Sequence, residues 1–192
     1  MTLIEVLIVI SIISLLGMTL YAALANGLRV YKRAQEIRLE QDVALFFDKI
    51  TRDLKNTYSY SKINFEGTLD RLAFPTIVHT LADSQLNLPE GTYVDQMGKG
   101  EYYFDYTERA LYRHQANYSE AIAEQYGKAQ IVVQSLKAVR FHYHYLKDNK
   151  EFINDHSEGL PLGVEVELEI SNHAEPFVIS RYIPIAVGEL LS

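Results

Sequence analysis

The sequence predicts an α+β fold in which one long N-terminal helix precedes a head rich in antiparallel strands. Residues 1–28 form an apolar run whose only charge is Glu5. Residues 29–59 keep apolar positions at three- and four-residue steps and contain no proline, which is typical of a continuing amphipathic helix. Residues 60–192 change to short alternating runs bounded by turn residues, as strands do. A helix followed by a series of strands is the α+β order.

The first segment, residues 1–28, has the length and composition of a membrane-spanning helix, which needs roughly 18 or more apolar residues. A signal peptide would begin with basic residues and have an apolar core of roughly 7–15 residues. One ionisable group inside a membrane helix costs about 3 kcal/mol, and less near its end. We therefore expect Glu5 to have a partner, and the natural one is the terminal amine of a neighbouring copy or relative. A plain membrane anchor gives no reason for this carboxylate.

The second segment, residues 29–59, predicts a helical continuation with one apolar stripe. The stripe consists of Ala34, Ile37, Gln41, Ala44, Phe47, Ile50 and Leu54. We expect core packing over residues 44–54 and contacts with sister helices around Ile37, Gln41 and Ala44. In the apolar segment we expect Leu7, Ile8 and Ile12 to make helix–helix contacts. The charged residues between the stripe positions, Asp53 among them, are predicted to face solvent.

The third segment, residues 60–192, predicts a series of strands. They cover residues 71–74 (ending at Pro75), 101–106, 110–113, 129–133, 139–145, 163–170 and 177–185. Residues 107–109, 147–150 and 172–173 are predicted turns, and residues 81–100, with one proline and three glycines, a loop. In 163–170 the alternation places Val and Leu inward and Glu outward. We expect 177–185 to be its antiparallel partner.

Composition and charge exclude several classes of function. The net charge is −7, the head from residue 60 onward carries −8, and there is no cysteine. An acidic head argues against nucleic-acid binding, which needs a basic surface. No catalytic or nucleotide-binding motif is found.

His142 and His144 would share one strand face, which gives two of the three ligands of a minimal metal site, but no third ligand is evident. We expect surface or half-buried histidines, no metal, no cofactor and no enzymatic activity.

The segment Thr2-Leu3-Ile4-Glu5-Val6-Leu7-Ile8 resembles the N-terminal methylation motif of type IV pilins and type II secretion pseudopilins. The resemblance implies a type IV pilin-like fold. It also implies that a prepilin peptidase processes the precursor and methylates Met1, and that Glu5 occupies the family's acidic position. Position one is usually Phe in the family, so Met1 is a departure.

Four stretches of the head resemble J-type minor pseudopilins of type II secretion: residues 65–74, 102–113, 135–143 and 160–168. The resemblance implies a structural subunit of the pseudopilus tip, anchored in the bacterial inner membrane with its head in the periplasm. The implied partners are I- and K-type minor pseudopilins and the major pseudopilin. The predicted loop 81–100 is a candidate contact with partner subunits or secreted substrate.

Two alternatives stay open. The first is a minor pilin of a type IV or competence pilus, because such pilins share the same overall architecture. A membrane-anchored binding module that needs no filament, and captures a ligand in its tyrosine-rich loops, is a hypothesis of a different class. An enzyme is a distant third.

Overall fold

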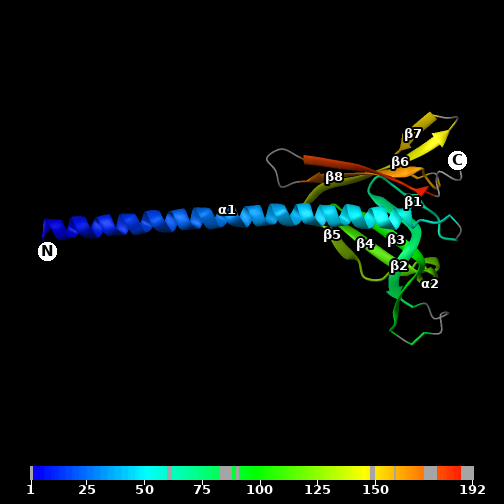
Figure 1. Ribbon diagram of the computed structural model, residues 1–192, viewed down its shortest axis with the longest axis horizontal. Helices are drawn as coiled ribbons and strands as arrows, with labels where there is room; N and C mark the ends of the chain where they lie inside the picture. The colour runs from blue at the N-terminus through cyan, green and yellow to red at the C-terminus, as the bar shows by residue number, and fades with distance from the viewer. Residues whose placement is uncertain are drawn as a thin grey trace. The chain divides into compact units, whose positions relative to one another are not determined.

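The computed structural model describes residues 2–59, 62–82, 88–89, 91–147, 150–157, 159–170 and 177–186. The chain divides into two compact units, residues 1–41 and 42–192. The first consists of α1 residues, and the second contains the end of α1 and all the strands (Figure 1).

The predicted long helix is confirmed: α1 runs without interruption from Leu3 to Lys55. It ends four residues before the predicted limit. Asn56, Thr57 and Ser59 follow, and such side chains compete for backbone hydrogen bonds and so favour turns over helix interiors. Arg52 and Lys55 lie in the last turn, where positive charge complements the helix dipole.

The strands form two antiparallel sheets. The first has the order β1-β2-β3-β4-β5 and the second the order β7-β6-β8-β9. The first sheet contains β1 (Glu66–Gly67), β2 (Arg71–Leu81), β3 (Tyr93–Asp105), β4 (Ala110–Asn117) and β5 (Gln130–Val133). The second contains β6 (Leu136–Lys147), β7 (Lys150–Asn154), β8 (Gly163–Ile170) and β9 (Phe177–Pro184). The short helix α2 (Tyr118–Ile122) follows β4.

The clearest strand predictions are confirmed. β8 has the predicted bounds, and Val164, Val166 and Leu168 are fully buried. β9 pairs with β8 in antiparallel register. The turn between β3 and β4 includes Arg109 with φ of 52°, and these strands form the predicted hairpin. Of the predicted turn 147–150, Lys147 ends β6 and Lys150 begins β7, while residues 148–149 lie outside the described residues. The predicted turn 172–173 also lies outside them.

Two strand predictions were wrong. The segment 81–100 is not a loop throughout, because β3 begins at Tyr93. The strand predicted to end at Pro75 does not end there, because β2 continues to Leu81. Among the described strands, β1 pairs with β2 at Leu72 and Ala73 and does not reach Pro75. Proline fits at this edge position, because its missing N–H breaks no ladder bond there.

Gly98 lies within β3, in the stretch predicted to be a loop, because there is no room for a side chain at this position. A Cβ at this position would lie 2.2 Å from the carbonyl oxygen of Ala116 and 2.4 Å from Cγ2 of Val78. The glycine therefore permits a close approach between β3 and β4, which is a known use of glycine within strands.

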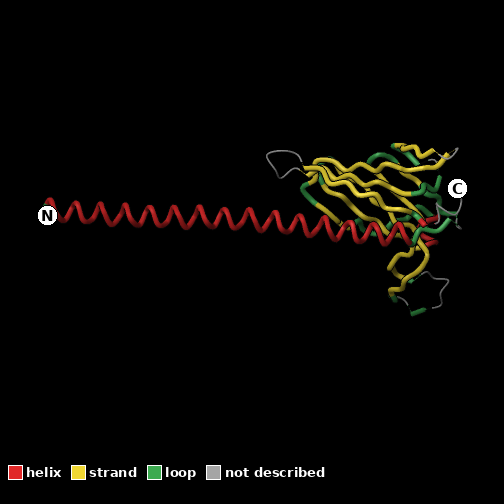
Figure 2. Tube along the Cα trace, turned by 45° about the horizontal axis from the view of Figure 1, so that its top comes forward, coloured by secondary structure: helices red, strands yellow, loops and turns green. Residues whose placement is uncertain are grey.

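The core of the second unit lies between the end of α1 and both sheets (Figure 2). The buried α1 residues there include Val43, Phe46, Phe47, Ile50 and Leu54. Phe46 packs edge-on against Tyr102 of β3, with ring centroids 5.8 Å apart. The guanidinium of Arg181 in β9 lies 4.7 Å from the ring centroid of Phe47. Ala44, predicted to belong to this core, is exposed, because the helical period places Val43 and Phe46 inward instead.

Candidate functional site

The side chains of the apolar segment of α1, residues 3–28, are exposed on all sides of the helix. Leu3 is 83% exposed, and Leu7, Ile8 and Ile12 are each more than half exposed. The helix is long and apolar enough to span a membrane. A continuous apolar surface of this kind needs lipid or other apolar helices around it.

Two hydroxyl groups within the segment donate hydrogen bonds to the helix backbone. Ser11 Oγ donates to the carbonyl of Leu7 at 2.8 Å, and Thr19 Oγ1 donates to the carbonyl of Leu16 at 2.8 Å. A polar group in hydrocarbon finds no water and must bond internally. These two bonds make Ser11 and Thr19 compatible with an apolar environment.

Glu5 lies in the first turn of α1, and its Oε2 accepts a hydrogen bond from the backbone N–H of Thr2 at 2.7 Å. This is one of the two bonds of a capping box, for which Thr-x-x-Glu is the sequence signature. The sequence analysis assigned Glu5 a partner in another molecule and missed this signal. An amide donor carries no net charge, so the bond does not neutralise the negative charge of Glu5. Met1 lies outside the described residues.

The predicted helix-contact residues of the second segment are exposed. Ile37 is 54% exposed, and Gln41 and Ala44 are also exposed. Their contact with sister helices stays a prediction.

A buried polar centre within the second unit was not anticipated. Asp53 of α1 is buried and lies 2.7 Å from Nη2 of Arg113 in β4. The hydroxyl of Tyr102 donates to the same carboxylate oxygen at 2.6 Å, and Nε of Arg113 donates to it at 2.9 Å. The prediction that Asp53 faces solvent was wrong. Its position three residues after Ile50 continues the buried face, which was the signal available in the sequence.

Burial raises the pKa of Tyr102 well above its usual value, and the Asp53 charge raises it further. Tyr102 therefore keeps its proton and stays a hydrogen-bond donor over the physiological range. The centre joins α1 to β3 and β4 through charge-assisted bonds, which are stronger than neutral ones. Because Asp53 and Tyr102 are almost fully buried, the role of this centre is structural: it clamps α1 to the first sheet.

The two histidines of β6 pair separately with acids. His142 Nδ1 lies 2.8 Å from Asp155, and His144 Nδ1 lies 2.8 Å from Glu151. His144 is more buried than expected for a surface histidine, at 8% exposure. Among the described residues, no three His, Cys, Asp or Glu side chains gather in a way that could hold a metal ion.

No protein-family model matches the chain, and no curated protein matches it significantly.

Proposed function

We propose that this protein is a minor pseudopilin of a type II secretion system, a structural subunit of the pseudopilus tip that helps to initiate filament assembly. The observation that carries the proposal is the exposed apolar surface of α1, with a carboxylate in its first turn. The partners would be I- and K-type minor pseudopilins and the major pseudopilin. Prepilin peptidase would process Met1, and the head would lie in the periplasm.

Assembly would move the apolar surface of α1 from one apolar environment, the membrane, into another, the interior of the filament. In the membrane, lipid covers residues 3–28; in the filament, neighbouring helices cover them. Each side chain then stays out of water, so assembly does not require the apolar surface to cross an aqueous phase. Leu7, Ile8 and Ile12 would make contacts in this segment, and Ile37 and Gln41 farther along the helix.

The charge of Glu5 gives the assembly its register. The Thr2 amide satisfies one lone pair of the carboxylate, but an uncharged amide does not neutralise it. A terminal amine from an adjacent subunit would neutralise it. Removing one partner of a buried ion pair costs about 3–5 kcal/mol, so a subunit docked out of register is strongly disfavoured.

The test is an anchor exchange in a secreting host. One variant carries an unrelated single-span anchor in place of residues 3–28, and a second carries Glu5→Ala. Both should enter the inner membrane, shown by fractionation, yet fail to co-purify with the other pseudopilins and fail to restore secretion in a deletion strain. Secretion restored by the anchor exchange would instead favour the binding module. A deletion strain that secretes normally but lacks pili would assign the chain to the pilus.

A further inference from the structure

Each sheet of the head ends in two edge strands, whose outward N–H and C=O groups have no neighbour within the sheet. Such an edge can pair with a strand of another chain, so proteins protect edges with short strands, proline, charged side chains or irregular pairing. In the described part of the chain the outer strands are β1 and β5 in the first sheet and β7 and β9 in the second. Three of these edges are protected, and the edge formed by β9 is not.

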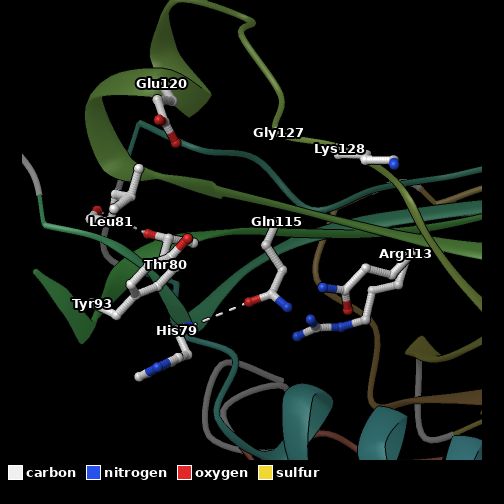
Figure 3. Close-up of a pocket in the computed structure, with 10 residues that line it drawn as sticks. His79, Thr80, Leu81, Tyr93, Arg113, Gln115, Glu120, Gly127 and Lys128 are labelled. Carbon is white, nitrogen blue, oxygen red and sulfur yellow. Dashed lines mark hydrogen bonds between the residues drawn. The ribbon is translucent and has the colours of Figure 1, made fainter. Parts of the chain in front are cut away.

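Both edges of the first sheet are protected. β1 has only two residues. Beyond it, β2 presents Pro75, which has no N–H, and His79, whose N–H donates to Oε1 of Gln115 at 3.3 Å (Figure 3). At the opposite edge β5 has four residues, and its pairing with β4 shifts register between Leu111 and Tyr112. Neither edge presents a long, regular row of backbone groups.

The two edges of the second sheet differ from each other. β7 has five residues and begins with two charged ones, Lys150 and Glu151. β9 has eight residues, and all of them pair with β8 without a shift in register. Its one charged side chain, that of Arg181, lies over the buried ring of Phe47 in α1 and so points away from the edge. Its one proline, Pro184, is its last residue. β9 therefore has the length and regularity that pairing with a further strand needs.

The backbone groups of alternate β9 residues point away from β8. The N–H of Ile185, just after the strand, donates to the carbonyl of Leu162 at 2.8 Å. In an antiparallel pair, residues alternate between facing the neighbouring strand and facing outward. Pro184 therefore faces outward, where its missing N–H breaks no bond. By the same alternation Val178 and Ser180 face outward, and no described strand pairs with their backbone groups.

The side chains of β9 leave apolar surface for an added strand to cover. Phe177 is 53% exposed, Val178 is 48% exposed and Tyr182 is 46% exposed. Phe177 and Val178 lie on opposite faces of the sheet, because side chains alternate along a strand. Ser180 Oγ donates to the carboxylate of Glu165 in β8 at 2.5 Å. This bond draws the Ser180 side chain back over the sheet and away from the edge.

Charge argues for a partner other than a second copy of the chain. The head from residue 60 onward carries −8, so two heads placed edge to edge would repel one another. Beside β9, the outward face of β8 carries Glu165, Glu167 and Glu169. In the part of the chain that the structure describes, Glu165 contacts Ser180 and His144 rather than a lysine or arginine. A segment that brings basic side chains to this face is therefore favoured.

We propose that the outer edge of β9 binds an extended segment of another protein, in which apolar and basic residues alternate. The segment becomes a further strand of the second sheet. Main-chain hydrogen bonds supply the affinity of such strand addition, and alternate side chains supply its specificity. The inference does not depend on the proposed function.

The experiment follows amide hydrogen exchange by NMR in the full chain, held in nonionic detergent micelles. The probe is the capped peptide Thr-Val-Lys-Val-Lys-Val-Thr. One control peptide has glutamate in place of both lysines, and the other has proline in place of the central valine. At saturation the probe should slow exchange of the Val178 and Ser180 amides about tenfold, and both controls should bind about tenfold more weakly. Unchanged exchange with the probe, or equal binding of the glutamate peptide, would overturn the proposal.

The chain without peptide provides a second arm of the same experiment. The amides of Val178 and Ser180 should exchange rapidly at every chain concentration. Protection that persists at high dilution would mean that the chain covers this edge itself. Protection that grows with chain concentration would mean that a second copy covers it. Either result would overturn the proposal.

Variants locate the binding at β9. Ser180→Pro removes an outward N–H but no bond to β8, so it should abolish probe binding. Val178→Lys keeps the backbone intact, places a like charge beside the basic probe and should weaken binding about tenfold. Ile131 on the edge strand β5 is also 48% exposed, so Ile131→Lys is the matched control and should leave the affinity unchanged. If Val178→Lys binds the probe as tightly as Ile131→Lys does, the assignment to β9 is wrong.

Discussion

The two ends of α1 follow one helical path but have different surroundings. Residues 3–28 are apolar around the whole circumference and exposed, whereas residues 42–55 bury one face and carry most of their charged side chains on the other. The second pattern is that of a helix completed by its own chain. The first is that of a helix completed by a membrane or by other helices. The head is therefore stabilised by contacts within the chain, while the apolar segment depends on surroundings that the chain does not supply.

Matched truncations should give the largest contrast between the two regions. Phe46 is fully buried and Leu15 is 65% exposed. Phe46→Ala should lower the free energy of unfolding of the head by about 3–5 kcal/mol, because it opens a cavity. Leu15→Ala should change it by less than about 0.5 kcal/mol. Urea unfolding of the full chain in micelles, followed by near-ultraviolet circular dichroism, measures both; equal losses would contradict the contrast.

The buried polar centre should give the next largest effect. Asp53→Asn keeps the shape of the side chain but removes the charge that Arg113 and Tyr102 bond to. The expected loss is about 1.5–3 kcal/mol, the range for hydrogen bonds to charged groups. Asp48→Asn on the exposed face of the same helix is the control and should be nearly neutral. An Asp53 variant as stable as this control would show that the centre does not clamp the helix.

Glycine substitutions should act in opposite directions in the two regions. Gly98→Ala places a methyl group against the Ala116 carbonyl, and we expect a loss of about 1–3 kcal/mol from overpacking. At Gly17 a Cβ meets nothing within 4 Å, so Gly17→Ala should raise the helix propensity by about 1 kcal/mol. Thermal unfolding of the head and helical content of the N-terminal segment give the two readouts. A neutral Gly98→Ala would contradict the close approach of β3 and β4.

Alkaline pH should destabilise the head gradually. Burial raises the pKa values of Tyr102 and Tyr143 above their usual value, while tyrosines in an unfolded chain ionise near pH 10. Above that pH the unfolded state binds fewer protons than the folded state, so stability falls as pH rises. Each such tyrosine contributes up to about 1.4 kcal/mol per pH unit. Urea midpoints between pH 8 and pH 11 should decline, and less steeply in Tyr143→Phe; a flat profile would exclude this effect.

The sequence predicts the regular elements well where periodicity is strong. Strand β8 was predicted with its observed bounds because Val and Leu alternate with Glu over eight residues. The long helix was predicted because an uncharged run continues into a three- and four-residue repeat. Pro75 and Gly98 misled the prediction, because both normally end strands, and only the pairing of β2 and β3 shows that an open edge and a close approach accommodate them.

Tertiary contacts account for what the sequence did not predict. Asp53 was assigned to solvent because a carboxylate in a helix is usually exposed, and its partner Arg113 lies sixty residues away. The first-turn bond of Glu5 is local and was available from Thr-x-x-Glu.

The exchange Glu5→Gln separates the two roles that the Glu5 carboxylate can have, charge pairing with another subunit and capping of its own helix. Glutamine keeps the acceptor for the Thr2 amide, because either Glu or Gln serves at this position of a capping box, but it removes the charge. If Glu5 acts by pairing with another subunit, Glu5→Gln should enter the membrane normally and fail to assemble and to restore secretion, as Glu5→Ala does. If Glu5→Gln assembles and secretes normally while Glu5→Ala does not, the carboxylate acts as a helix cap and the account is wrong.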